Sequence, residues 1–502
     1  MLFCRLKRQN NIHCVYRQSN QQSRPSVGFR QRMASQEEVK MNHQETKEAP
    51  FGMRDRLGYM FGDFGNDFTF LLSSMFLMKF YTDVMGVSAA VVGAMMMIAR
   101  VVDAFSDVTM GQICDRCRPG KKGKFAPWIR RMCGPVALAS FLMYAVWFKD
   151  MPMGFKIFWM FFTYLLWGSI CYTGINIPYG SMASAITADP KERTSLSSFR
   201  TIGATLANTV IGVVLPLIVY YEDAQGNTVF SGSRMMTAAL LCSVGAIICY
   251  LLCYHMTTER VKMEKTAEKF SFKELIRTTI SNRALIGIVA AALLLLLAQL
   301  TLSGMGNYIY PNYFGNREAM STANMGVTVI TLALSTVIVN ISGKYGRKEL
   351  AGVGAAVGAI ALIAAFILHT KNVWVFVALY LISSLGTAIF NLVCWAMITD
   401  VIDDAEVRTG KRSDGTIYAV YSFARKLGQA ASSGLTGGLL TMVGYSAATA
   451  FEPQVVDGIY NITCLVPAAG FILLALALKF LYPLDKKQVE KNAKILREKR
   501  GE

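Results

Sequence analysis

The sequence predicts an all-α integral membrane protein with twelve transmembrane helices arranged as two six-helix halves. Of the 502 residues, 53% are hydrophobic and only 17% are charged, whereas about a quarter of a soluble domain is charged. Apolar stretches of roughly 20 residues recur along the chain, which is the length that crosses a hydrocarbon core about 30 Å thick. Short segments between these stretches hold most of the Lys and Arg. Because backbone polar groups in lipid must be satisfied internally, each stretch should be a helix.

The predicted spans form two sets of six around a hydrophilic central loop. They lie near residues 58–82, 88–114, 128–148, 156–186, 196–221 and 233–256, and near 284–310, 322–343, 349–369, 373–400, 415–443 and 458–482. The domains that we expect are an N-terminal tail (1–50), the first half (51–256), the central loop (257–283), the second half (284–484) and a charged C-terminal tail (485–502). Similar basic segments, 111–124 and 343–348, follow the second span of each half. Such a repeat is typical of transporters built from paired halves.

The N-terminal tail is polar and has no acidic residue before Glu37. It lacks the apolar stretch of a secretory signal. Its composition fits a disordered tail, or a start codon placed too early with Met33 or Met41 as the true start. A transit peptide is the alternative.

Basic residues gather in every second loop, whereas the opposite loops hold Asp83, Glu222 and Asp223. The positive-inside rule therefore places both termini in the cytoplasm. We expect the protein in the cell (inner) membrane. The same rule accounts for the net charge of +18, so no nucleic-acid partner is predicted. Most of the eleven cysteines lie in or beside apolar stretches and do not suggest a disulfide framework.

Charged residues inside spans are functional candidates because burying them in lipid is costly. In the second span, Asp103 and Asp107 are four residues apart and share a helix face, with Arg100 one turn earlier. Two close carboxylates repel each other unless a cation or proton relieves them. The pattern predicts a coupling-ion site, and the alternative is a static Arg–Asp–Asp packing network.

Further polar side chains occur on four other spans and could meet in one cavity with these carboxylates. Sugars need such groups because each hydroxyl both donates and accepts hydrogen bonds. The alternative for each is a snorkelling cation or an amide that packs against another helix. These residues are Asp63, Asn66, Asp67, Tyr172, Thr173, Asn176, Arg200, Arg425 and Lys426.

Six motifs carry a resemblance to a known family. They are LGYMFGDFGND (57–67), FYTDV (80–84), ARVVDAFSD (99–107), GKFAPW (123–128), NIPYGS (176–181) and TDVID (399–403). Together they resemble the glycoside–pentoside–hexuronide:cation symporters, a melibiose permease-like family of the major facilitator superfamily. The resemblance covers about residues 55 to 445 and implies the major facilitator fold. It is closer to the xyloside/glucuronide branch than to the galactoside carriers, because Asn176 and Gly180 replace an Asp and a Trp.

The resemblance implies roles for individual residues. Asp103, Asp107 and Thr173 fall at cation-binding positions, with the two carboxylates as metal ligands if the ion is Na+. Ser106 replaces an Asn there and so favours a proton. Residues at or near the implied sugar positions are Asp67, Asn66, Tyr172, Asn176 and Arg200, and those with a coupling or gating role are Arg100, Lys426 and Asp63.

The sequence therefore predicts a secondary active symporter that couples uptake of a sugar or glycoside (xyloside, glucuronide or related) to Na+ or H+ by alternating access. Its expected partners are the substrate, the monovalent cation or proton and the lipid bilayer. We expect a monomer with no cofactor. An enzyme is not predicted, since the four His form no ligand or nucleophile pattern. The alternatives are a major facilitator carrier of a lipid, peptide or drug, and a membrane sugar sensor that does not transport.

Overall fold

A computed structural model describes residues 50–500, apart from residues 118, 121, 262–281 and 411–413. Residues Phe51–Glu502 form one compact unit. Most of the predicted N-terminal tail and most of the predicted central loop lie outside the described residues. The domain boundaries proposed for them stay predictions.

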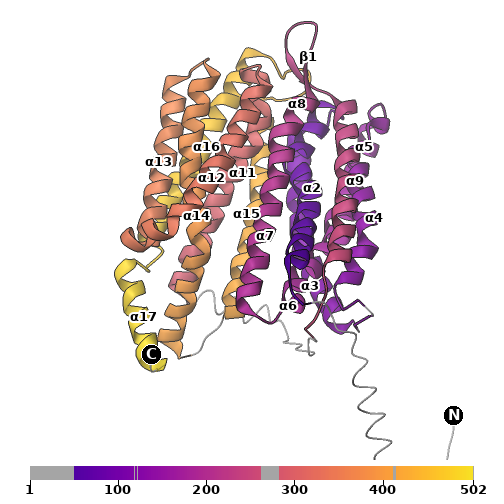
Figure 1. Cartoon of the computed structure of the whole chain (residues 1–502). Coiled ribbons are helices and arrows are strands. Elements are labelled where there is room, and N and C mark those ends of the chain that lie inside the picture. Colours follow the sequence, from indigo (N-terminus) through magenta and orange to yellow (C-terminus); the bar gives the residue numbers. More distant parts are fainter. Residues whose placement is uncertain (1–49, 118, 121, 262–281, 411–413, 501–502) are drawn as a thin grey trace, which may run out of the picture. The chain divides into compact units, whose positions relative to one another are not determined.

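The first half consists of helices joined by short connections (Figure 1). Its helices are α2 (Met53–Asp83), α3 (Ala89–Arg116), α4 (Ala126–Leu142), η1 (Val146–Phe148), α5 (Met153–Leu165), η2 (Leu166–Tyr172), α6 (Thr173–Ile186), α7 (Pro190–Thr209), η3 (Val210–Val214), α8 (Leu215–Val219) and α9 (Gly232–Met256). The π-helical segment η2 joins α5 and α6 into one continuous span, and η3 does the same for α7 and α8.

The second half repeats this all-helical organisation. Its helices are α11 (Arg283–Tyr308), η4 (Ile309–Tyr313), α12 (Arg317–Tyr345), α13 (Arg347–Leu368), α14 (Val373–Thr409), α15 (Asp414–Met442) and α16 (Pro453–Phe480). The predicted charged tail forms a further helix, α17 (Lys486–Arg500), which packs against α14 and α13.

The predicted fold class, an all-α membrane protein, is confirmed. Ten helical segments of the described residues are long and apolar enough to cross a bilayer. The first and eleventh predicted spans are also continuous helices, α2 and α15, but they are not among those ten. Both carry charged and polar side chains along their length, so a total of twelve spans stays a prediction.

Local sequence signals explain where several helices begin and end. Asp189 caps α7 by accepting a 2.7 Å hydrogen bond from the backbone N–H of Lys191, and Pro190 opens the helix, a position where its missing N–H costs nothing. Gly410 ends α14 with φ at 70°, a left-handed conformation that glycine adopts without strain.

A two-stranded hairpin marks one end of the helices. Strands β1 (Tyr220–Glu222) and β2 (Thr228–Phe230) pair antiparallel, with Tyr220 opposite Phe230. Gly226 in the connecting turn has φ at 81°, where a side chain would be strained. The hairpin lies at the opposite end of the helices from α17 (Figure 1), and we call these the hairpin end and the α17 end.

The predicted orientation can be tested at these two ends. Gln225 is exposed in the hairpin turn and Lys191 is exposed at the start of α7. In a variant without accessible native cysteines, Gln225→Cys should react with an impermeant maleimide added to intact cells. Lys191→Cys should react only after permeabilisation. The reverse pattern would contradict the orientation that the basic loops predict.

An apolar core that runs through the first half extends into the second half at the hairpin end. This core contains Tyr308, Tyr310 and Tyr445 of the second half together with first-half residues. A separate core consists of second-half residues alone. In addition, α3 packs along α15, so the helix with the paired carboxylates lies at the contact between the halves.

Candidate functional site

The paired carboxylates of α3 each have a basic and a hydroxyl partner. Arg100 Nη1 lies 3.5 Å from Asp103 Oδ2, and Ser169 Oγ donates a 2.6 Å hydrogen bond to Asp103 Oδ1. Thr173 Oγ1 donates a 2.8 Å hydrogen bond to Asp107 Oδ1. The ammonium of Lys426, which belongs to α15, pairs with Asp107 Oδ2.

We call Arg100, Asp103, Asp107 and Lys426 the charge cluster. The positive charges of Arg100 and Lys426 equal the negative charges of the two carboxylates in number. Lys426 therefore takes the place of the added cation or proton that would otherwise relieve the repulsion between the carboxylates. This lysine comes from the second half of the chain, whereas the carboxylates come from the first. A cation that binds at Asp107 must therefore compete with a contact between the halves.

The predicted cation residues lie together in the structure. Ser106 Oγ donates to the backbone carbonyl of Asp103 at 3.1 Å and lies 3.4 Å from Thr173 Oγ1. Among the described residues, no group of three or more His, Cys, Asp and Glu side chains is placed to hold a metal ion. The site instead supplies carboxylate and hydroxyl oxygens, the type of ligand that hard cations take.

Ser169 contacts the charge cluster, and the sequence did not predict this contact. It lies in the π-helical segment η2, directly before α6, and π-helical turns frequently occur at functional sites. Its position one turn before Thr173 on the same helix was the available signal. The two hydroxyls then contact carboxylates that are also one turn apart, on α3.

One predicted sugar residue contacts a predicted gating residue. Arg200 Nε donates to Asp63 Oδ1 at 2.8 Å, so the guanidinium pairs with Asp63 and not with Asp67. The Arg200 side chain is 46% exposed. Among the described residues, the Asp67 carboxylate makes no hydrogen bond or ion pair, so it retains its acceptors for a ligand.

Two other predicted sugar residues contact each other across α2 and α6. Asn66 Nδ2 donates to Asn176 Oδ1 at 3.4 Å, and Tyr250 OH donates to Asn66 Oδ1 at 2.9 Å. Tyr172 stacks on Phe70 with ring centroids 5.8 Å apart. These contacts place Asn176 and Tyr172 beside α2, the helix that carries Asn66, Asp63 and Asp67.

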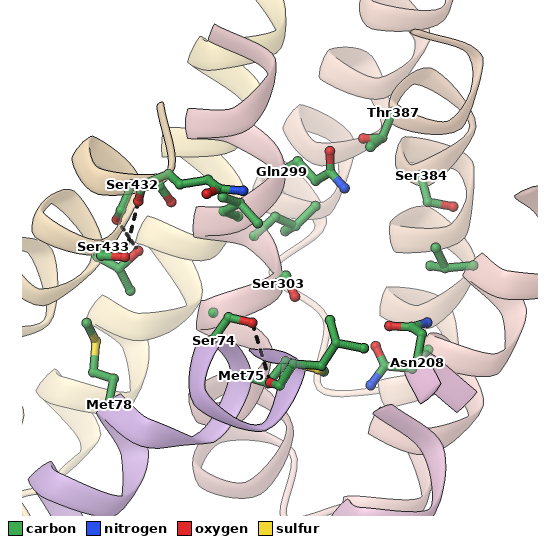
Figure 2. Close-up of a pocket in the computed structure, with 18 of the residues that line it drawn as sticks. Ser74, Met75, Met78, Asn208, Gln299, Ser303, Ser384, Thr387, Ser432 and Ser433 are labelled. Atoms are coloured by element: carbon green, nitrogen blue, oxygen red, sulfur yellow. Dashed lines mark hydrogen bonds between the residues drawn. The ribbon is translucent and has the colours of Figure 1, made fainter. Parts of the chain in front are cut away.

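A cavity of about 330 Å³ lies between the halves. Its wall includes α2, α3, α7, α11, α12, α14 and α15, and Figure 2 shows hydroxyl and amide side chains around it. The cavity contains none of the five predicted sugar residues in its wall. The α2 residues in the wall include Phe70, Leu71 and Ser74, which lie after Asp67 along α2, nearer the hairpin end. Among the described residues of the wall, Arg100 alone carries a charged side chain, and it connects the cavity to the charge cluster.

A second buried ion cluster closes the hairpin end. Lys79 Nζ lies 2.9 Å from Asp83 Oδ2 and donates to Asn312 Oδ1 at 2.9 Å and to Tyr445 OH at 2.7 Å. Tyr445 OH in turn donates to Asp83 Oδ1 at 2.9 Å. Asn312 and Tyr445 belong to the second half, so this Lys79 cluster joins the halves.

The Lys79 cluster lies next to the cavity. Lys79 Nζ is 4.5 Å from the ring centroid of Tyr308, and Tyr308 is part of the cavity wall. The Lys79 side chain is only 2% exposed. Lys79 was not among the residues predicted from the sequence, although a lysine inside an apolar stretch of α2 was a signal that could have identified it.

Comparisons with known proteins agree with this fold. The family described as MFS/sugar transport protein matches residues 58–486. The uncharacterized symporter YjmB of Bacillus subtilis is 31% identical over 445 residues, 88% of this chain and 94% of that protein. The glucuronide carrier protein homolog of Escherichia coli is 31% identical over 437 residues, 87% of this chain and 93% of that protein. A bacterial homolog of the human lysosomal transporter Spinster, solved inward-facing and unoccupied, superposes with a TM-score of 0.65 at 13% identity, covering 89% and 99% of the two chains.

Proposed function

Because this chain belongs to the MFS/sugar transport protein family, we propose that it is a symporter that couples uptake of a sugar or glycoside to Na+ or H+. One relative bears the name symporter and another is a glucuronide carrier homolog, which supports a glycoside such as a glucuronide or xyloside as cargo. In this proposal the protein acts as a monomer in the cell (inner) membrane, with both termini in the cytoplasm.

The observation that carries this proposal is the contact between Asp107 and Lys426. It connects the carboxylate that we propose to bind the ion, in one half, to an ammonium group of the other half, across the surface where the halves would move. Paired halves with a site between them support alternating access. A cation at Asp107 would release Lys426 and so alter the relative stability of the inward-facing and outward-facing states.

Uptake into proteoliposomes tests the proposal. Purified protein is reconstituted and offered radiolabelled methyl β-D-xyloside and methyl β-D-glucuronide, with an inward Na+ gradient, an inward H+ gradient or neither. A symporter concentrates one of these glycosides only when its coupling gradient is present. Binding without accumulation would support a membrane sugar sensor, and the absence of both would support a non-sugar cargo.

Asp67 provides a prediction for the substrate site. Its carboxylate has no partner among the described residues and can accept charge-assisted hydrogen bonds from sugar hydroxyls, each contributing about 1.5–3 kcal/mol. Asp67→Ala should weaken glycoside binding by about tenfold or more, whereas cation binding should persist, because Asp67 makes no contact with the charge cluster.

Isothermal titration of the purified variant with glycoside, and separately with Na+ or by pH titration, measures both affinities. Thr201→Val is the matched control, since the Thr201 hydroxyl is exposed and already donates to the Ser197 carbonyl at 3.1 Å. An unchanged glycoside affinity in an Asp67→Ala protein that still transports would make Asp67 a structural residue.

A further inference from the structure

The second-half wall of the cavity carries three carboxamides. They belong to Gln299 on α11, Asn391 on α14 and Gln429 on α15. Asn391 Nδ2 donates a 3.2 Å hydrogen bond to Gln299 Oε1, which holds the first two amides side by side. Figure 2 shows the Gln299 amide at the cavity together with Ser384 and Thr387 of α14.

This amide pair has unused hydrogen-bonding capacity. Among the described residues, Gln299 Nε2 and Asn391 Oδ1 have no partner, and neither does the side-chain amide of Gln429. All three side chains are half-buried and line the cavity, so their free atoms are open to water or to a ligand that enters it.

The pair offers one donor, Gln299 Nε2, and one acceptor, Asn391 Oδ1, on two amides that contact each other. A hydroxyl group donates one hydrogen bond and accepts others, so a single hydroxyl, or two adjacent ones, can accept from Gln299 Nε2 and donate to Asn391 Oδ1. A carboxylate lacks the donor that Asn391 Oδ1 needs. Within the part of the chain that the structure describes, the one charged side chain of the cavity wall is Arg100, which comes from α3 of the first half and is paired with Asp103.

We infer that Gln299 and Asn391, assisted by Gln429, form a subsite that recognises hydroxyls on an uncharged part of the transported glycoside. The inference rests on the proposed function and extends it. The first half would bind the substrate through Asp67, and the second half through neutral amides. Substrate contact with both halves is what allows binding to change the balance between the two states of the carrier.

The test removes the amide and the hydroxyl in turn. Binding of methyl β-D-xyloside and of its 2-, 3- and 4-deoxy analogues is measured by titration on purified wild type, Gln299→Met and Asn391→Leu. Each variant should bind the parent glycoside about tenfold more weakly, the loss of roughly one good hydrogen bond. One deoxy analogue should bind the wild type about as weakly, and should lose nothing further in the variants.

Thr331→Val is the matched control, because Thr331 lines the same cavity but its hydroxyl already donates to the Val327 carbonyl at 2.8 Å. Its affinity for every analogue should match that of the wild type. Gln429→Met keeps the test decisive if the paired amides prove necessary for folding. Among the described residues, the Gln429 side-chain amide makes no hydrogen bond to another helix. This variant should also bind the parent glycoside more weakly.

The outcomes separate the two proposals. If the variants bind the parent glycoside like the wild type, or lose affinity for every analogue equally, the amides only join α11 to α14 and the inference is wrong. If the wild type binds neither methyl β-D-xyloside nor methyl β-D-glucuronide, the proposed function is itself overturned. A hydroxyl-specific loss that follows Gln299 and Asn391 supports both.

Discussion

Replacing Asp103 or Asp107 by Asn should abolish concentrative uptake while leaving exchange of glycoside across the membrane intact. Each substitution removes one charge and nearly preserves the shape of the side chain. In the wild type, Asp103 is paired with Arg100 and Asp107 with Lys426. Either variant leaves the charge cluster with an excess positive charge, which repels an added cation or proton.

The loss should appear in the coupling between the two ligands. Cation and glycoside must change each other's affinity by the same factor, typically about 5–150-fold in coupled systems. In Asp103→Asn and Asp107→Asn this factor should fall to one, so that the cation no longer raises glycoside affinity. Glycoside binding itself should persist, because Asp67 and the amide pair are unchanged.

Counterflow and gradient-driven uptake, measured in the same proteoliposome preparation, distinguish these effects. Both variants should retain counterflow and show no accumulation above equilibrium with an imposed ion gradient. Ser169→Ala is an informative comparison, since it removes a 2.6 Å hydrogen bond to Asp103 without removing a charge, and accumulation should be reduced but not lost. Full accumulation in both Asn variants would remove Asp103 and Asp107 from the coupling site.

Lys79→Met should open the hairpin end of the protein. The ammonium joins Asp83 of the first half to Asn312 and Tyr445 of the second half, and breaking one member of a buried ion pair typically costs about 3–5 kcal/mol. That cost falls on the closed state, in which the contacts exist. Loss of these contacts should therefore shift the free-energy difference between the two states by several kcal/mol in favour of the state that is open at this end.

Cysteine accessibility measures the shift. Ser303 lies in the wall of the cavity, so Ser303→Cys reports whether the cavity is open to the hairpin side. In the Lys79→Met background its reaction with an impermeant maleimide added from that side should be at least about tenfold faster, which corresponds to about 1.4 kcal/mol. Net transport should fall, because the carrier no longer closes efficiently at this end.

Lys156→Met is the matched control for this experiment. Lys156 Nζ donates a 2.8 Å hydrogen bond to the Met85 carbonyl, so it is a lysine near the same end whose contact stays within the first half. Its removal should leave the labelling of Ser303→Cys unchanged. If Lys79→Met lowers the unfolding temperature without changing that labelling, the Lys79 cluster contributes only to stability.

The sequence by itself determined the helices and the features that depend on helical spacing. Long apolar stretches in lipid must be helical because their backbone polar groups have no other partners. The common face of Asp103 and Asp107 follows from their separation of four residues on α3. The implied cation-site position of Thr173 came from family resemblance, and its hydroxyl contacts Asp107 in the structure.

Only the tertiary structure decided which charges meet across helices. Arg200 pairs with Asp63 and not with Asp67, although the two acids lie one turn apart on α2. Lys426 reaches Asp107 from the other half, and Lys79 reaches Asn312 across 233 positions of the chain. Helical periodicity defines neighbours within about four residues, but it contains no information on the rotation and axial register of one helix against another. Those are set by side-chain packing between helices, and they place the ion pairs on which the proposed mechanism depends.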